Sequence, residues 1–147
     1  PINKSLELSP HNLGLFRRHG YFPGFCAHLR GSFQYSDSNG YDVETYIQIY
    51  NCLGFLMQVE VENVAKVIWN AKKPVMTIKS MAAGRCTPYV GLSFSYHTIR
   101  DCDMVTVGAH TVEEVYEDIE IALAALEKRF PEMASRNSPK HTQLLGW

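Results

Sequence analysis

A lysine and an arginine flank a glycine turn in the segment KKPVMTIKSMAAGRC, residues 72–86. Residues 75–81 read as a buried strand, yet Lys79 lies near its end, followed by Gly84 and Arg85. A lysine among apolar neighbours can lose its proton and form a Schiff base with a carbonyl, or it can stay charged and bind a carboxylate or phosphate. Arg85 offers a fork of donors to the same anions, and the missing side chain of Gly84 lets a ligand approach the backbone.

Both cations also have structural interpretations. Lys79 can extend its ammonium to water or pair with Asp103 or Glu44. Arg85 can cap a helix or lie on the surface. The residue types alone therefore leave three roles open for Lys79: nucleophile, anion holder or structural residue.

Further polar residues and a glycine follow the other predicted strands at their carboxyl ends, where parallel barrels bind ligands. His28 and His110 can act as general acid or base or as hydrogen-bonded structural residues. Tyr50 and Asn51 can orient a substrate, although a tyrosine can equally fill a core. Gly108 precedes a helix whose first N–H groups favour an anion, but acidic residues in its first turn already supply negative charge there.

The elements that must position these residues alternate along the chain. Strands are predicted at about 21–29, 43–51, 75–81 and 103–109, and helices at about 58–72, 90–99 and 111–129, with a loop and one helical turn at 31–42. The last helix has the clearest start, because Thr111 and Glu114 have the spacing of a capping box. Its apolar stripe is Val112, Val115, Ile119, Ala122, Leu123 and Leu126.

This order predicts an α/β fold of parallel strands with outer helices. Open doubly wound sheets and (β/α) barrels both satisfy it. Two features favour the barrel: polar residues such as Gln48 and Thr77 alternate on the strands as at a barrel mouth, and no strand precedes a G-x-G-x-x-G motif. Residues 1–130 are predicted as one domain and 131–147 as a polar tail. Four strands do not close a barrel, so we expect the last four strands of a TIM-like barrel, with the open edges covered by an N-terminal half or a second copy.

Composition excludes several classes of partner and cofactor. The net charge is −1 and no basic stripe is present, so no nucleic-acid partner is expected. No apolar run approaches the ~20 residues of a membrane span. The four cysteines are widely spaced, which indicates a reduced, cytoplasmic chain and no metal site.

Three segments carry a resemblance to known proteins. DVETYIQIYN at 42–51, KPVMTIK at 73–79 with AAGR at 82–85, and DMVTVG at 103–108 resemble the last strands of an uncharacterised microbial family of TIM-barrel proteins. The resemblance covers about residues 21–126. A more distant similarity is to the C-terminal half of aldo-keto reductases, whose catalytic residues lie in an N-terminal half that this chain lacks.

These observations predict a barrel-type enzyme for a small carbonyl- or phosphate-bearing metabolite, of aldolase-like (lyase) or reductase-like chemistry. Lys79 and Arg85 would hold or activate the anionic end, and His28 or His110 would move protons. No cofactor is required. The alternatives are a non-catalytic half-barrel for assembly or ligand sensing, and a reductase-like protein that binds NADPH.

Overall fold

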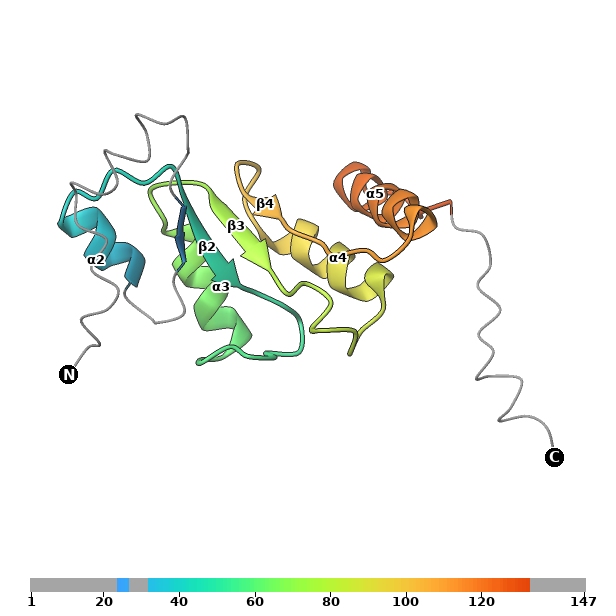
Figure 1. Ribbon diagram of the computed structural model, residues 1–147, viewed down its shortest axis with the longest axis horizontal. Helices are drawn as coiled ribbons and strands as arrows, with labels where there is room; N and C mark the ends of the chain where they lie inside the picture. Colours follow the sequence, from blue (N-terminus) through green and yellow to red (C-terminus); the bar gives the residue numbers. More distant parts are fainter. Residues whose placement is uncertain (1–23, 27–31, 133–147) are drawn as a thin grey trace.

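A computed structural model describes residues 24–26 and 32–132, which form a parallel sheet with helices packed against it (Figure 1). The strands are β1 (Gly24–Cys26), β2 (Thr45–Ile49), β3 (Val75–Ile78) and β4 (Met104–Val105). The helices are α2 (Ser32–Ser38), α3 (Val61–Trp69), α4 (Pro88–Thr98) and α5 (Val112–Glu127). The predicted α/β class is confirmed. His28 and the tail from residue 133 onward lie outside the described residues.

The described strands follow one another in the sheet in the order β1-β2-β3-β4, and every pairing is parallel. Tyr46 lies opposite Val75, and Thr77 lies opposite Val105. A doubly wound sheet reverses its strand order at a switch point, and each half of it keeps one direction. The order of the described strands fits one half of such a sheet as well as part of a barrel.

One face of this sheet is buried under α2, α3 and α4. The ring of Tyr46 stacks on Phe33 of α2, with 4.2 Å between the ring centroids. Ile68 of α3 belongs to the same buried cluster, and the ring of Tyr50 tilts against Phe94 of α4 at 5.3 Å. The three helices therefore cover the same side of the strands.

Gln48 and Thr77 share this helix-covered face with Tyr46, because side chains alternate along a strand. The Thr77 hydroxyl donates to the Met104 carbonyl at 3.0 Å, and the Gln48 amide donates to the carbonyl of Ile49 at 3.0 Å. Their predicted position at a barrel mouth is wrong. The polar alternation reflects hydrogen bonds within a buried layer, not a solvated opening.

A buried ion pair connects the amino ends of the neighbouring strands β3 and β4. The Asp103 carboxylate is fully buried and accepts hydrogen bonds from Nε and Nη2 of Arg100, at 2.9 and 2.7 Å, and from the Val75 N–H at 2.8 Å. The same guanidinium donates to the carbonyls of Ala71 and Lys73. These hydrogen bonds to Asp103 raise the pKa of Arg100. The loops that precede β3 and β4 are thereby joined through one side chain.

Gly91 allows α4 to approach the loop that leads into it. A Cβ atom at this position would lie 2.7 Å from the Ser80 carbonyl oxygen and 3.2 Å from the Cys86 sulfur. Glycine is a poor helix former, but close packing requires it at this position. Thr87 caps the helix through its hydroxyl, which accepts from the Val90 N–H at 3.4 Å.

Helix α5 begins where the capping box predicts, with the Thr111 hydroxyl accepting from the Glu114 N–H at 3.2 Å. The Glu114 carboxylate accepts from the N–H of His110, one residue earlier than the standard box. The helix packs on α4 through Ile121 and Ala124.

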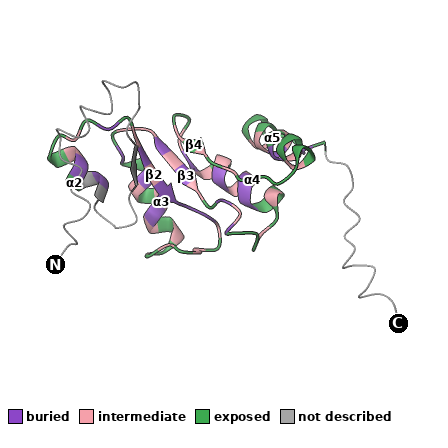
Figure 2. Ribbon diagram, in the orientation of Figure 1, coloured by how far each residue is buried: buried purple, intermediate pink, exposed green. Residues whose placement is uncertain are grey.

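The predicted apolar stripe of α5 is only partly covered. Much of the helix is exposed (Figure 2), including five of the six stripe residues: Val112, Val115, Ile119, Leu123 and Leu126. The periodicity correctly identifies the helix, and three stripe residues line the space between α5, α4 and β4: Val115, Ile119 and Ala122. The most deeply buried residues of the helix are Asp118, Ile121 and Ala124. Among the described helices, none has the length and apolar character needed to cross a membrane.

Candidate functional site

The carboxyl ends of the parallel strands point to the same edge of the sheet, which we call the carboxyl edge. It consists of the segments that follow the strands: residues 50–60 after β2, 79–87 after β3 and 106–111 after β4. All predicted site residues within the described part of the chain lie in these three segments. The structure gives them different surroundings.

Tyr50 is part of the core. Its side chain is 1 % exposed, and its hydroxyl donates to the Thr98 hydroxyl of α4 at 3.0 Å. Burial raises the pKa of Tyr50. Thr98 in turn donates to the Phe94 carbonyl at 2.7 Å. Tyr50 therefore joins β2 to α4 and does not face a ligand.

Asn51 shapes the segment after β2. Its carbonyl oxygen accepts from the N–H groups of Leu53 and Phe55, at 3.2 and 2.8 Å, and its amide donates to the Phe55 carbonyl at 2.9 Å. The side chain is fully buried. An asparagine that binds the backbone two to four residues onward organises a tight turn. Asn51 thus positions Phe55 at the carboxyl edge.

The segment after β3 has an unusual backbone. Lys79 has φ +65°, Ala82 +49°, Ala83 +57° and Gly84 +79°. For residues with a Cβ atom the left-handed region costs roughly 1–2 kcal/mol each. The Met81 carbonyl accepts from the N–H groups of Gly84 and Arg85, at 2.9 and 3.2 Å, so hydrogen bonds hold the loop in this form. Backbone strain of this kind concentrates at functional sites.

Arg85 lies on the aromatic ring of Phe55. Its guanidinium carbon is 3.8 Å from the ring centroid, and Nη1 donates to the Ala82 carbonyl at 3.2 Å. Stacking orients the plane of the guanidinium while most of its N–H donors remain available. The segments after β2 and β3 therefore meet at this contact.

Lys79 is exposed, and among the described residues no hydrogen bond or ion pair engages its ammonium group. The structural pairing with Asp103 is not made, since Arg100 holds that carboxylate at the opposite edge of the sheet. The next residue, Ser80, is 2 % exposed, and its hydroxyl has no hydrogen-bond partner within the described part of the chain. The exposed ammonium of Lys79 is thus the group of this pair that a ligand can reach.

The segment after β4, residues 106–111, makes fewer interactions at the carboxyl edge. Gly108 and His110 are exposed, and the backbone N–H of His110 donates to Glu114 at 2.7 Å. Glu114 places a carboxylate at the start of α5, which disfavours a bound anion there. Of the predicted residues, the structure groups Lys79, Gly84 and Arg85 on one loop and separates Tyr50 and Asn51 from it by their buried contacts.

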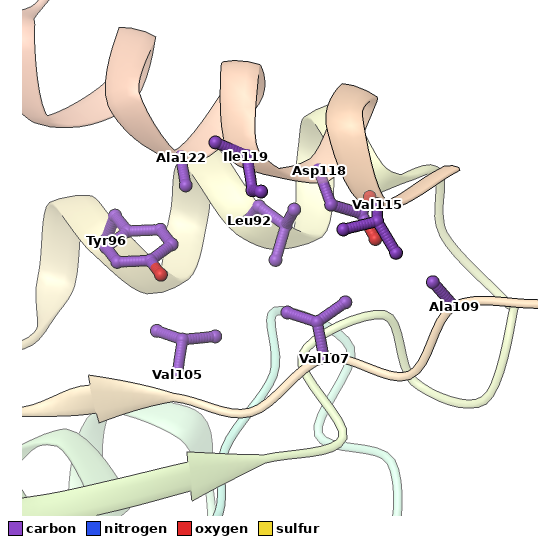
Figure 3. A pocket seen from close by; sticks show the side chains of 9 residues that line it. All are labelled: Leu92, Tyr96, Val105, Val107, Ala109, Val115, Asp118, Ile119 and Ala122. Carbon is purple, nitrogen blue, oxygen red and sulfur yellow. The ribbon is translucent and has the colours of Figure 1, made fainter. Parts of the chain in front are cut away.

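A pocket of about 220 Å³ lies between α4, α5 and the segment through β4, and it reaches the carboxyl edge at Val107 and Ala109. Figure 3 shows its side chains converging from both helices and from the strand below them. Apart from the hydroxyl of Tyr96, its one polar side chain is the carboxylate of Asp118, which is 8 % exposed. The pocket includes neither Lys79 nor Arg85, so it does not coincide with the polar groups of the carboxyl edge.

Sequence reasoning missed three residues of the carboxyl edge: Phe55, Cys52 and Cys86. The thiols of Cys52 and Cys86 are partly exposed, and they lie on the segments after β2 and β3. The cysteines are far apart in the sequence, but both follow neighbouring parallel strands, and that signal predicts proximity. No group of three or more metal-ligating side chains occurs within the described ranges.

Comparison of the chain with protein-family models, with curated proteins and with solved structures finds no match. No relative therefore indicates a ligand or a reaction for these residues.

Proposed function

We propose that the chain is a (β/α) barrel-type protein that binds a small anionic metabolite, with a phosphate or carboxylate, at its carboxyl edge. The observation that carries this proposal is the loop after β3, which presents Lys79 and Arg85 without a carboxylate partner among the described residues. In a soluble fold two nearby cations without acidic neighbours favour an anion.

The sheet supports the barrel part of the proposal. In a (β/α) barrel the strands follow sequence order and all helices lie outside. The described strands keep sequence order, and α2, α3 and α4 cover one face. The opposite face carries apolar residues without a covering helix among those described, which suits the interior of a barrel: Ile47, Ile49, Met76, Ile78 and Met104.

The exposure of Lys79 favours an anion-holding role over the Schiff-base role. A lysine nucleophile generally requires a pocket that removes water from its amine. The guanidinium of Arg85, oriented by its stacking on Phe55, would bind the anion through two N–H donors. Lys79 would contribute a flexible side chain with a single positive charge. Proton transfer by His110 or His28 remains a further proposal for an enzyme of this type.

The test is a titration with inorganic phosphate, followed by the amide chemical shifts of isotope-labelled protein. Shifts should concentrate on residues 79–86. Lys79→Ala should weaken binding roughly 10- to 100-fold, the value of one lost charge-assisted hydrogen bond. Lys72→Ala is the matched control, because Lys72 is also exposed but precedes β3 at the other edge. Equal losses in both variants would mean that binding is non-specific.

The variant Arg85→Lys distinguishes two contributions of Arg85 to anion binding: its positive charge and the fixed orientation of its guanidinium. The lysine keeps the charge but loses the stacked, bidentate geometry, so binding should still weaken. Borohydride treatment in the presence of pyruvate tests the nucleophilic role: a covalent adduct on Lys79 would favour an aldolase-like reaction, and its absence would favour anion holding.

The outer surface of α5 favours a second candidate, assembly with other copies of the chain. Large apolar residues there are unusually exposed, Val112 to 64 % and Leu126 to 58 %. Exposed apolar patches often mark protein interfaces. Light scattering distinguishes this candidate, since a monomer at all concentrations would contradict it. The NADPH-binding alternative gains no supporting contact among the described residues.

A further inference from the structure

Two cysteines meet at the carboxyl edge. The last hydrogen bond between β2 and β3 joins the Tyr50 N–H to the Ile78 carbonyl at 3.1 Å. Cys52 and Ser80 each follow this hydrogen bond by two residues. The loop after β3 then turns back, and the Cys86 thiol lies 3.8 Å from the Ser80 carbonyl oxygen. This turn brings Cys86 close to Cys52 on the neighbouring segment.

A second contact holds the two segments together at the same point. The guanidinium of Arg85, next to Cys86, stacks on Phe55 at 3.8 Å. Asn51, next to Cys52, binds the backbone of Phe55 through three hydrogen bonds. Cys86 therefore adjoins one partner of the contact between the loops, and Cys52 adjoins the residue that positions the other partner.

The Cys52 thiol also lies close enough to act on the Cys86 thiol. Burial, and then the neighbouring Cys52 thiol, raise the pKa of Cys86. Both thiols are partly exposed, so a small reagent can reach them. Neither is engaged in a disulfide in the structure.

We infer that Cys52 and Cys86 form a reversible disulfide that joins the segments after β2 and β3. The oxidant is a small-molecule disulfide, such as oxidised glutathione. One cysteine thiolate attacks the reagent, a mixed disulfide forms and one reduced thiol leaves. The second cysteine then attacks the mixed disulfide and releases the second reduced thiol, so that two protein thiols are oxidised and one reagent disulfide is reduced.

The disulfide acts on the loop that carries Lys79 and Arg85. In the reduced protein the two loops are joined by noncovalent contacts, and in the oxidised protein a covalent bond fixes them. The inference does not depend on anion binding, because it follows from the position of the thiols alone.

Cys102 supplies an internal control. It is exposed beside Asp103, at the amino edge of the sheet, with its sulfur 3.8 Å from the Asp103 carboxylate. Cys102 therefore has the accessibility that oxidation needs but lies away from the pair. A reagent that simply modifies exposed cysteines should attack Cys102 first.

The sequence allows every cysteine to be followed separately. Cleavage after lysine and arginine places Cys26 in residues 19–30, Cys52 in 31–66, Cys86 in 86–100 and Cys102 in 101–128. The whole chain is incubated with oxidised glutathione, blocked with an alkylating reagent and digested without reduction. The product should be the peptide 31–66 linked to 86–100, together with an intact mass lower by two hydrogen atoms.

Cys102→Ser should give the same linked peptide. Cys86→Ser should lose it and retain glutathione on Cys52 instead, because the resolving thiol is absent. Formation of the link in the wild-type chain should accelerate as pH rises, since the raised pKa of Cys86 limits its thiolate. Reduction should restore both free thiols.

The inference is overturned if the wild-type chain carries glutathione on Cys52 and Cys86 without a link. Links that join Cys102 or Cys26 to either residue, or that join two chains, would overturn it as well. The wild-type and Cys102→Ser results decide the question even where a variant at Cys52 or Cys86 fails to fold.

Discussion

Removal of the Asp103 carboxylate should destabilise the fold severely while leaving the carboxyl edge unaffected. The side chain of Asp103 is fully buried and accepts hydrogen bonds from Arg100 and from the Val75 N–H. Arg100 is only 17 % exposed and is also held by the carbonyls of Ala71 and Lys73, so it cannot simply swing into water when the carboxylate is lost. Asp103→Ala therefore leaves a largely buried cation without its carboxylate and the backbone N–H groups of Val75 and Arg100 without this acceptor.

Breaking a buried pair by removing one partner typically costs about 3–5 kcal/mol. For a chain of this size, 1 kcal/mol lowers the melting temperature by about 2–4 °C, so the expected decrease is roughly 10 °C. Urea unfolding followed by circular dichroism measures the free energy of unfolding directly.

Two further variants make the reasoning testable. The double variant Arg100→Met with Asp103→Leu removes both charges and should recover much of the loss, because no unpaired charge remains. Glu120→Ala breaks the exposed pair of Glu120 with Arg129 and should have a far smaller effect. A loss below about 1 kcal/mol for Asp103→Ala would refute the view that this ion pair locks the amino edge. Phosphate binding should be unchanged in the folded fraction of the variant.

Two other predictions follow from single residues. Gly91→Ala should destabilise the protein, although alanine is favoured over glycine in a helix by about 1 kcal/mol, because the new Cβ would lie 2.7 Å from a backbone oxygen; a higher denaturation midpoint would contradict this packing. Glu120, hydrogen bonded by Arg129 and by the Glu132 N–H, has its pKa lowered from 4.5 to about 2. Its stabilising contribution should be complete above pH 4.5 and lost as pH falls toward 2, and Glu120→Gln should flatten the stability profile in that window; an identical profile in both proteins would argue against the pair.

The sequence predicted elements well where the signal is local. The alternation in residues 43–51 identified β2, and the spacing of Thr111 and Glu114 identified the start of α5. Both signals depend on atoms a few residues apart. Strand lengths were less accurate: the strand predicted to reach Met81 ends at Ile78, because Lys79 takes a left-handed φ, and the one predicted at 103–109 is only Met104–Val105.

The roles of individual side chains were harder to predict. Gln48 and Thr77 were interpreted as barrel-mouth residues, yet they are buried beneath the helices. The pattern of a strand shows that its faces differ, but not which face the helices cover. The same limit applies to α5, whose periodic stripe is largely exposed although three of its residues face α4 and the segment through β4.

Residue types and their spacing are enough to predict the alternation of strands and helices, the cap of α5 and the placement of Lys79, Gly84 and Arg85 after one strand. What these residues contact depends on how the elements pack. Arg85 stacks on Phe55, and Cys86 lies beside Cys52, because parallel pairing brings the ends of neighbouring strands together across some thirty residues of chain. Local propensity acts within a few residues, whereas such contacts depend on how whole strands and helices pack, and so they have no signature in any one segment.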